Sequence, residues 1–187
     1  MPEVVNILSE YFDVDYVCNS KLSSELAMET NDRAICEAVF KTGCDLNKHL
    51  NNATGDTLLI KAVSENHSPE MIELLLKYGA DPDLGNDLNE TAIHKASSLG
   101  LLEILRILVK HCHYLNRCDT KGQTALFKAV ANGFCDVVKI LVKAGTDLEW
   151  TDAEKRTPLI CAVESNQVEV VKVLLEAGSS FILSYFR

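Results

Sequence analysis

The stretch DTKGQTALFKAVANGFCDVVKILVKAG, residues 119–145, decides the fold because its helix-cap and turn residues recur at a fixed interval on both sides. Thr91 and Thr124 are 33 residues apart, and so are Thr124 and Thr157. The same interval separates the residues Gly79, Cys112, Gly145 and Gly178. A period of this length is typical of a chain built from repeated structural units.

Within this stretch the pattern predicts two short helices. Thr124 caps the first, which ends at Gly133, and the second runs from about Asp136 to Ala144 and stops at Gly145. Their apolar sides comprise Ala125, Leu126, Ala129 and Val130, and then Val137, Val138, Ile140, Leu141 and Val142. Helices of about nine residues are too short to be stable alone in water. Each unit therefore needs stacked copies that cover its apolar faces.

Four in-phase copies of the unit are present. They read DTLLIKAVSENHSPEMIELLLKYG (56–79), ETAIHKASSLGLLEILRILVKHC (90–112), QTALFKAVANGFCDVVKILVKAG (123–145) and RTPLICAVESNQVEVVKVLLEAG (156–178). In period and in its TPLH-like positions this pattern resembles the ankyrin repeat family. The resemblance implies an all-α solenoid of stacked helix-turn-helix units with protruding β-hairpin-like loops. In the first copy, Ser68 and Pro69 are expected to be the N-cap and first residue of the second helix.

We expect residues 1–187 to form one domain. Its predicted units are a partial repeat with only a second helix (1–19), a degenerate repeat (20–51), three repeats (52–85, 86–118, 119–151) and a last repeat with an apolar C-terminal tail (152–187). Because the opening MPEVVNILSEYF lacks a first helix before it, a longer native chain is favoured over a shortened cap. The tail, which includes FILSYFR, is expected to fold back over the last helix pair or to meet a partner, since solenoids usually end in a polar copy.

Composition narrows the classes of partner. The chain has 27 acidic and 18 basic residues and a net charge of -9, which argues against nucleic-acid binding and fits a protein partner with basic groups. No apolar run is long enough for membrane insertion. The seven cysteines are odd in number and form no CxxC pair, so they are interpreted as reduced thiols in the cytoplasm or nucleus.

No catalytic constellation and no cofactor motif are found, so the chain is predicted not to be an enzyme. His94 is expected to hydrogen-bond the backbone of an adjacent loop rather than to act in catalysis. His111, Cys112, His113 and Cys118 form the only grouping that resembles a metal site. Because three consecutive residues do not easily converge on one ion, loop packing is favoured and no metal is predicted.

One modification site follows from the family resemblance. The sequence Asp45–Leu46–Asn47 has the acid, apolar, Asn form that is a known target of asparagine hydroxylation in ankyrin-like loops, whereas Asn116 fits less well because Tyr114 replaces the acid. The alternative, which we favour, is that the amide of Asn47 ties down its own turn.

The resemblance to the family implies that a protein partner binds to the loop tips and the first helices. The candidate protein-binding residues are Asp56, Ser64, Glu65, Asp87, Leu88, Glu90, Ser98, Leu99, Thr120, Lys121, Gln123, Ala131, Asn132, Trp150, Glu154, Arg156, Glu164 and Ser165. Trp150 is either a binding anchor or packed along the neighbouring loop.

The predicted function is a scaffold, adaptor or inhibitor that binds a protein through these loop tips and a concave face. The alternative is a targeting or substrate-recruiting segment of a larger enzyme, channel or ubiquitin-ligase assembly. The chain is expected to be a monomer unless its apolar ends pair.

Overall fold

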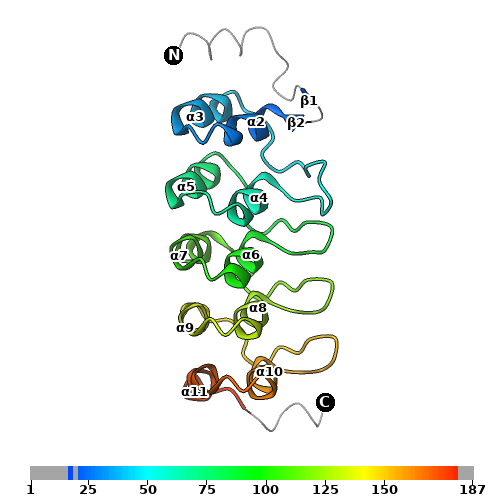
Figure 1. Ribbon diagram of the computed structural model, residues 1–187, viewed down its shortest axis with the longest axis vertical. Coiled ribbons are helices and arrows are strands. Elements are labelled where there is room, and N and C mark those ends of the chain that lie inside the picture. The colour runs from blue at the N-terminus through cyan, green and yellow to red at the C-terminus, as the bar shows by residue number, and fades with distance from the viewer. Residues whose placement is uncertain (1–16, 19–20, 181–187) are drawn as a thin grey trace.

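The computed structural model describes residues 17–18 and 21–180, and in this part of the chain ten short helices stack in pairs (Figure 1). The first helices of the pairs are α2 (Ser23–Glu29), α4 (Leu58–Ser64), α6 (Ala92–Leu99), α8 (Ala125–Ala131) and α10 (Pro158–Glu164). The second helices are α3 (Arg33–Lys41), α5 (Pro69–Lys77), α7 (Leu102–His111), α9 (Cys135–Lys143) and α11 (Val168–Glu176).

Two strands of two residues each precede the first pair. β1 (Val17–Cys18) runs antiparallel to β2 (Lys21–Leu22). Most of the partial repeat expected at 1–19 and most of the C-terminal tail lie outside the described residues. From residue 20 onward, one helix pair lies within each expected unit, although the exact unit boundaries stay a prediction.

The helices form two parallel rows, and the loops project to one side of the stack (Figure 1). First helices pack on first helices, α4 against α6 and α6 against α8, and second helices pack likewise, α5 against α7 and α7 against α9. One continuous core results. The equivalent leucines Leu75, Leu108, Leu141 and Leu174 are all fully buried within it. The all-α solenoid fold is therefore confirmed.

The helix boundaries follow the local signals closely. Ser68 is the N-cap of α5, where its hydroxyl accepts a hydrogen bond from Met71 N–H, and Pro69 is the first helical residue, as predicted. The helix expected over about 136–144 runs from Cys135 to Lys143, one residue earlier.

The threonine caps are not equivalent. Thr57 and Thr157 accept hydrogen bonds from the backbone N–H groups of Ile60 and Ile160, at 3.3 and 3.4 Å. Thr124 also occupies the N-cap position, but its buried hydroxyl has no hydrogen-bond partner. The predicted N-cap position of Thr124 is thus confirmed, but its side chain forms no capping hydrogen bond.

This difference predicts opposite responses to one substitution. Thr57→Val should lower the free energy of unfolding by about 1 kcal/mol, because a helix cap is lost. Thr124→Val should be neutral or slightly stabilising, because an unsatisfied buried hydroxyl is removed. Urea unfolding followed by circular dichroism measures both. Equal losses in the two variants would contradict the assignment.

A polar side chain closes each protruding loop. Asp119 Oδ1 accepts from Lys121 N–H at 2.8 Å and from Gln123 N–H at 2.9 Å. The equivalent residues, which accept from the N–H groups two and four positions later, are Asn52, Asn86 and Asp152. Short polar side chains favour such turns.

Adjacent loops are also joined to one another. Thr120 N–H donates to Leu88 O at 3.0 Å, and the corresponding bonds run from Asp87 to Thr54 and from Ala153 to Lys121. The hairpin-like shape of the loops therefore depends on side-chain closure and on single backbone bonds between repeats.

Candidate protein-binding surface

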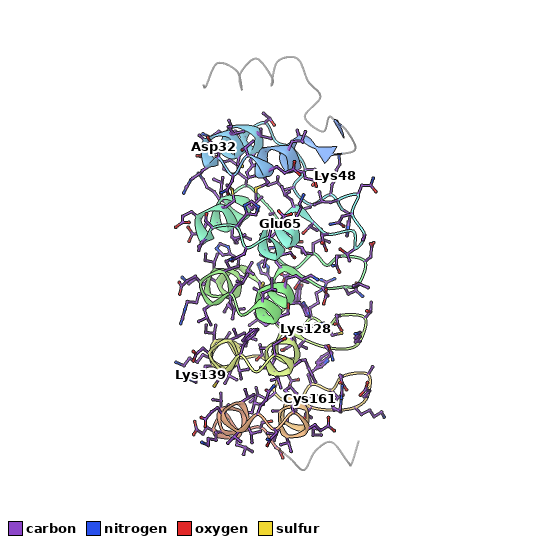
Figure 2. The ribbon with its side chains drawn as sticks, viewed as in Figure 1. Asp32, Lys48, Glu65, Lys128, Lys139 and Cys161 are labelled. Carbon is purple, nitrogen blue, oxygen red and sulfur yellow. The ribbon has the colours of Figure 1, made fainter. Side chains whose placement is uncertain are left out.

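The predicted binding residues gather on the side of the stack that carries the first helices and the loop tips (Figure 1). Twelve of the eighteen are exposed: Ser64, Glu65, Leu99, Ala131, Asn132, Glu164 and Ser165 at the ends of first helices, and Asp87, Leu88, Thr120, Lys121 and Glu154 in the loops. We call these twelve residues the inner face. Figure 2 shows Glu65 on this row of helices and Lys139 on the opposite row.

Asp56 is an exception, because the structure uses it internally. Its carboxylate is buried and accepts from Asn86 Nδ2 at 2.7 Å and from Asn52 Nδ2 at 3.2 Å. Asp56 thereby joins two consecutive loops and offers little surface to a partner.

Glu90 is also committed to internal contacts. Its carboxylate pairs with Lys95 and, at 3.0 Å, with Lys128, and Lys128 in turn contacts Asp119 at 2.6 Å. Glu90 and Lys128 belong to consecutive repeats. The chain of charges therefore ties the repeat 86–118 to the repeat 119–151.

These contacts shift the pKa values of the groups involved. Burial alone raises the pKa of Glu90, but hydrogen bonds from Lys95 and Lys128 outweigh it and hold that pKa below its usual value. The pKa of Asp119 is lowered in the same way, against burial, by Lys128 and by the backbone N–H of Gln123. The pKa of Lys128 is raised because its two carboxylate partners outweigh its burial.

Lys61, Lys95 and Lys128 occupy the same position in three successive repeats and form a column of cations. The last repeat interrupts this column, because Cys161 takes that position in α10, as the labels of Lys128 and Cys161 in Figure 2 indicate. Burial raises the pKa of Cys161 to about 11. The thiol is therefore protonated at neutral pH and is a poor nucleophile.

Arg156 supplies the missing cation from the loop. Its Nε and Nη2 donate to Asp152 Oδ2 at 3.0 and 2.8 Å, and the guanidinium also reaches Glu154 and Glu164. Arg156, another candidate binding residue, is thus partly used to stabilise its own loop. Gln123 and Ser98 are half-buried as well.

The charge excess of the chain lies away from the second helices. Those five helices contain seven acidic and eight basic residues, so the net charge of -9 arises elsewhere. On the inner face the exposed carboxylates are Glu65, Asp87, Glu154 and Glu164, against one exposed cation, Lys121. This face is therefore acidic.

His94 behaves as predicted. Its Nδ1 accepts from Thr91 N–H at 3.2 Å, so its Nε2–H donates to Gln123 O at 3.1 Å in the adjacent loop. Burial lowers the pKa of His94, and the ring is held neutral. It links two repeats and is not exposed to a substrate.

Trp150 adopts the packing arrangement that the sequence left open. Its indole N–H donates to Gly122 O at 3.0 Å in the preceding loop, and the side chain is half-buried. Whether the exposed part of the ring also contacts a partner stays a prediction.

Asn47 connects repeats rather than tying down its own turn. Its Nδ2 donates to Gly79 O at 3.0 Å and its Oδ1 accepts from Asp81 N–H at 2.8 Å. Equivalent side chains that accept from the next repeat are Asp83, Asn116 and Glu149. The favoured alternative, that the Asn47 amide ties down its own turn, is thus wrong about the partner of the amide. The amide does stabilise the structure, but by joining two repeats.

The segment around His113 and Tyr114 is a surface feature that the sequence did not single out for protein binding. Both side chains are exposed, at 79% and 66%. With Asn116 and Arg117 they line a surface hollow of about 450 Å³. The available signal was Cys112 in a position that is otherwise glycine.

The described residues offer neither a metal-binding cluster nor a membrane-spanning helix. Among the described residues, no three His, Cys, Asp or Glu side chains form a group suited to a metal ion. No helix in the same ranges combines the length and apolar character required to cross a bilayer.

Stacked helix pairs, closed loops and an open polar face define a repeat solenoid. The chain belongs to the ankyrin repeat family, because the family model described as ankyrin repeats (3 copies) matches residues 24–117 and 111–183. Members of this family are generally protein–protein interaction modules and are typically non-catalytic.

A solved structure agrees with this assignment. The crystal structure of an ankyrin repeat domain from Acinetobacter baumannii is 26% identical and superposes with a TM-score of 0.86. The match covers 95% of this chain and 92% of that one. No curated protein sequence matches significantly.

Proposed function

We propose that this protein is a non-catalytic scaffold, adaptor or inhibitor that binds a protein partner through the inner face. The acidic excess of that face carries the proposal, because it complements a partner with basic groups. Asp56 and Glu90 behind the face are already bonded across repeats, so the surface is preformed and little ordering is needed on association.

The partner is first identified by photo-crosslinking. A benzoylphenylalanine at Asn132, on the inner face, should capture a discrete protein in cells that express the native chain. The same group at Lys139, on the opposite row of helices, serves as the matched control and should not capture that protein.

Charge reversal then tests the mode of binding. Glu65→Lys with Glu164→Lys should weaken the partner's affinity at least tenfold, about 1.4 kcal/mol, because two carboxylates of the inner face are reversed. Glu103→Lys with Glu169→Lys makes the same change in net charge on second helices and should alter affinity less than twofold. Calorimetric titration measures both. Equal weakening by the two pairs would argue against binding at the inner face.

A second candidate function is recruitment within a larger enzyme, channel or ubiquitin-ligase assembly. It is favoured by the last helix pair, where Val163 is 46% exposed although the equivalent Val130 is fully buried. Val168 and Leu175 are exposed beside it. An exposed apolar face of this kind can pack against another part of a larger assembly or against the same face of a second copy. If neither contact forms, we expect a monomer. The mass of the native protein and of its assembly distinguishes these options.

We place this activity in the cytoplasm or nucleus, because Cys36, Cys44, Cys112, Cys118, Cys135 and Cys161 are all free thiols.

Asn47 stays a proposed hydroxylation site. Its amide is half-buried and bonded at both ends, so a modifying enzyme would have to open the contact with Gly79 and Asp81.

A further inference from the structure

We propose that residues 112–117, the first part of the connector between α7 and α8, form a second docking site that takes an acidic side chain of a partner protein. The occupant is a protein, as in the proposed function. The surface and its charge preference are different, however, because the connector offers hydrogen-bond donors where the inner face offers carboxylates.

The connector departs from the repeat at its first residue. Gly79 and Gly145 end their helices with φ of 93° and 85°, and the residue after each donates back into the helix. Cys112 has a φ of -68° instead. His113 N–H then donates to Asp83 Oδ2 at 2.9 Å rather than to its own helix.

This change of direction turns a buried position outward. Ala80 and Thr146, the equivalents of His113, are buried. His113 is exposed, and its Nδ1 lies 3.1 Å from the Asp83 carboxylate, which accepts a hydrogen bond from it. Tyr114 N–H contacts the same carboxylate at 3.4 Å. Asp83 thus holds both exposed residues in place.

Tyr114 also replaces an aspartate. Asp81 and Asp147, at the same position of the adjacent connectors, accept hydrogen bonds from their own turns, from Asp83 N–H and Glu149 N–H. The phenol cannot close the turn in this way and projects into solvent. Tyr114 is the most exposed of the large hydrophobic side chains described. Exposed tyrosines are frequent anchors in interfaces.

Each of the four residues that line the hollow also carries an N–H or O–H group that can donate a hydrogen bond. Asn116 Oδ1 already accepts from Asp147 N–H, so the amide N–H groups are the part of this side chain that can still donate to a ligand. Arg117 forms no ion pair within residues 21–180 and is exposed. A guanidinium beside an amide and a phenol O–H suits a carboxylate, which a guanidinium binds through two parallel hydrogen bonds.

The rings of His113 and Tyr114 supply the apolar part of the site. Their centroids lie 6.5 Å apart with planes inclined by 55°. An aliphatic or aromatic residue next to the acidic one in the partner can pack on this surface. A basic side chain is the competing occupant, because Asp83 contacts His113 and because Asp81 and Asp147 belong to the adjacent connectors, but Arg117 would repel it.

Selection of random peptides displayed on phage tests the proposal. Peptides are selected on the whole protein, and each is then titrated against Arg117→Gln and Tyr114→Ser. We expect one class of peptides to lose at least tenfold in affinity with both variants and to share an Asp or Glu next to an apolar residue. Arg106→Gln, an exposed arginine of α7, is the matched control and should change affinity less than twofold.

Three results would overturn the proposal: no peptide sensitive to both variants, a sensitive class that carries Lys or Arg in place of the acid, or equal sensitivity to Arg106→Gln. The thermal melts of all variants are compared to confirm an intact fold. Peptides that respond to Glu65→Lys with Glu164→Lys report on the inner face. The proposal for the connector site and the proposal for the inner face can therefore be rejected independently of each other.

Discussion

Replacing Lys128 by methionine should lower the free energy of unfolding by about 2–4 kcal/mol, because two largely buried carboxylates lose their shared cation. Lys128 contacts Glu90 of the preceding repeat and Asp119 of its own. Methionine retains most of the side-chain volume, so the loss reports on charge rather than on packing. Urea unfolding monitored by circular dichroism provides the measurement.

Lys172→Met is the matched control. The Lys172–Glu169 pair has a similar separation, 2.8 Å, but both side chains are exposed. Exposed pairs contribute little, so its removal should leave the free energy of unfolding nearly unchanged. Similar losses in the two variants would mean that the contacts of Lys128 do not stabilise the stack.

The same pair of variants predicts a dependence on pH. The folded-state pKa values of Glu90 and Asp119 are lowered, so their contribution is present at neutral pH and is lost as pH falls through those values. The wild-type protein should therefore lose more stability between about pH 5 and pH 2 than the Lys128→Met variant does. Parallel pH profiles of the two proteins would contradict this expectation.

Leu108→Ala should have the largest effect, a loss of about 3–5 kcal/mol. Leu108 is fully buried in α7, which packs between α5 and α9. Since each repeat is stabilised by its neighbours, a cavity in a central repeat weakens both adjoining contacts. The expected result is a lower urea midpoint, with a transition that broadens as the two halves of the stack uncouple.

Leu175→Ala is the corresponding control in the last repeat. Leu175 is 52% exposed, so less apolar surface returns to water and no closed cavity forms. A loss below about 1 kcal/mol is expected. If both substitutions cost the same, the stack would not be organised around the buried leucine row.

Several local features could be predicted because their causes lie within a few residues. Ser68 and Pro69 begin a helix through the hydroxyl and the fixed φ of the ring. The contact of His94 with the next loop could also be anticipated, because the repeat brings equivalent positions together. The repeat pattern predicts Asp56 and Glu90 as binding residues, and the structure differs because the exposure of a side chain cannot be read from its repeat position alone. Each turns inward to a partner about 30 or more residues away.

By itself, the sequence determined the period, the helix pairs and the stack, because a repeated apolar pattern on helices too short to survive alone has one way to bury its surface. The tertiary structure alone decided which polar groups remain for a partner. Lys128 and Asp56 are bonded across repeats, whereas His113 faces solvent because Cys112 turns the connector outward, with Tyr114 and Arg117 exposed beside it. Such outcomes depend on contacts between neighbouring repeats, and no single repeat contains them.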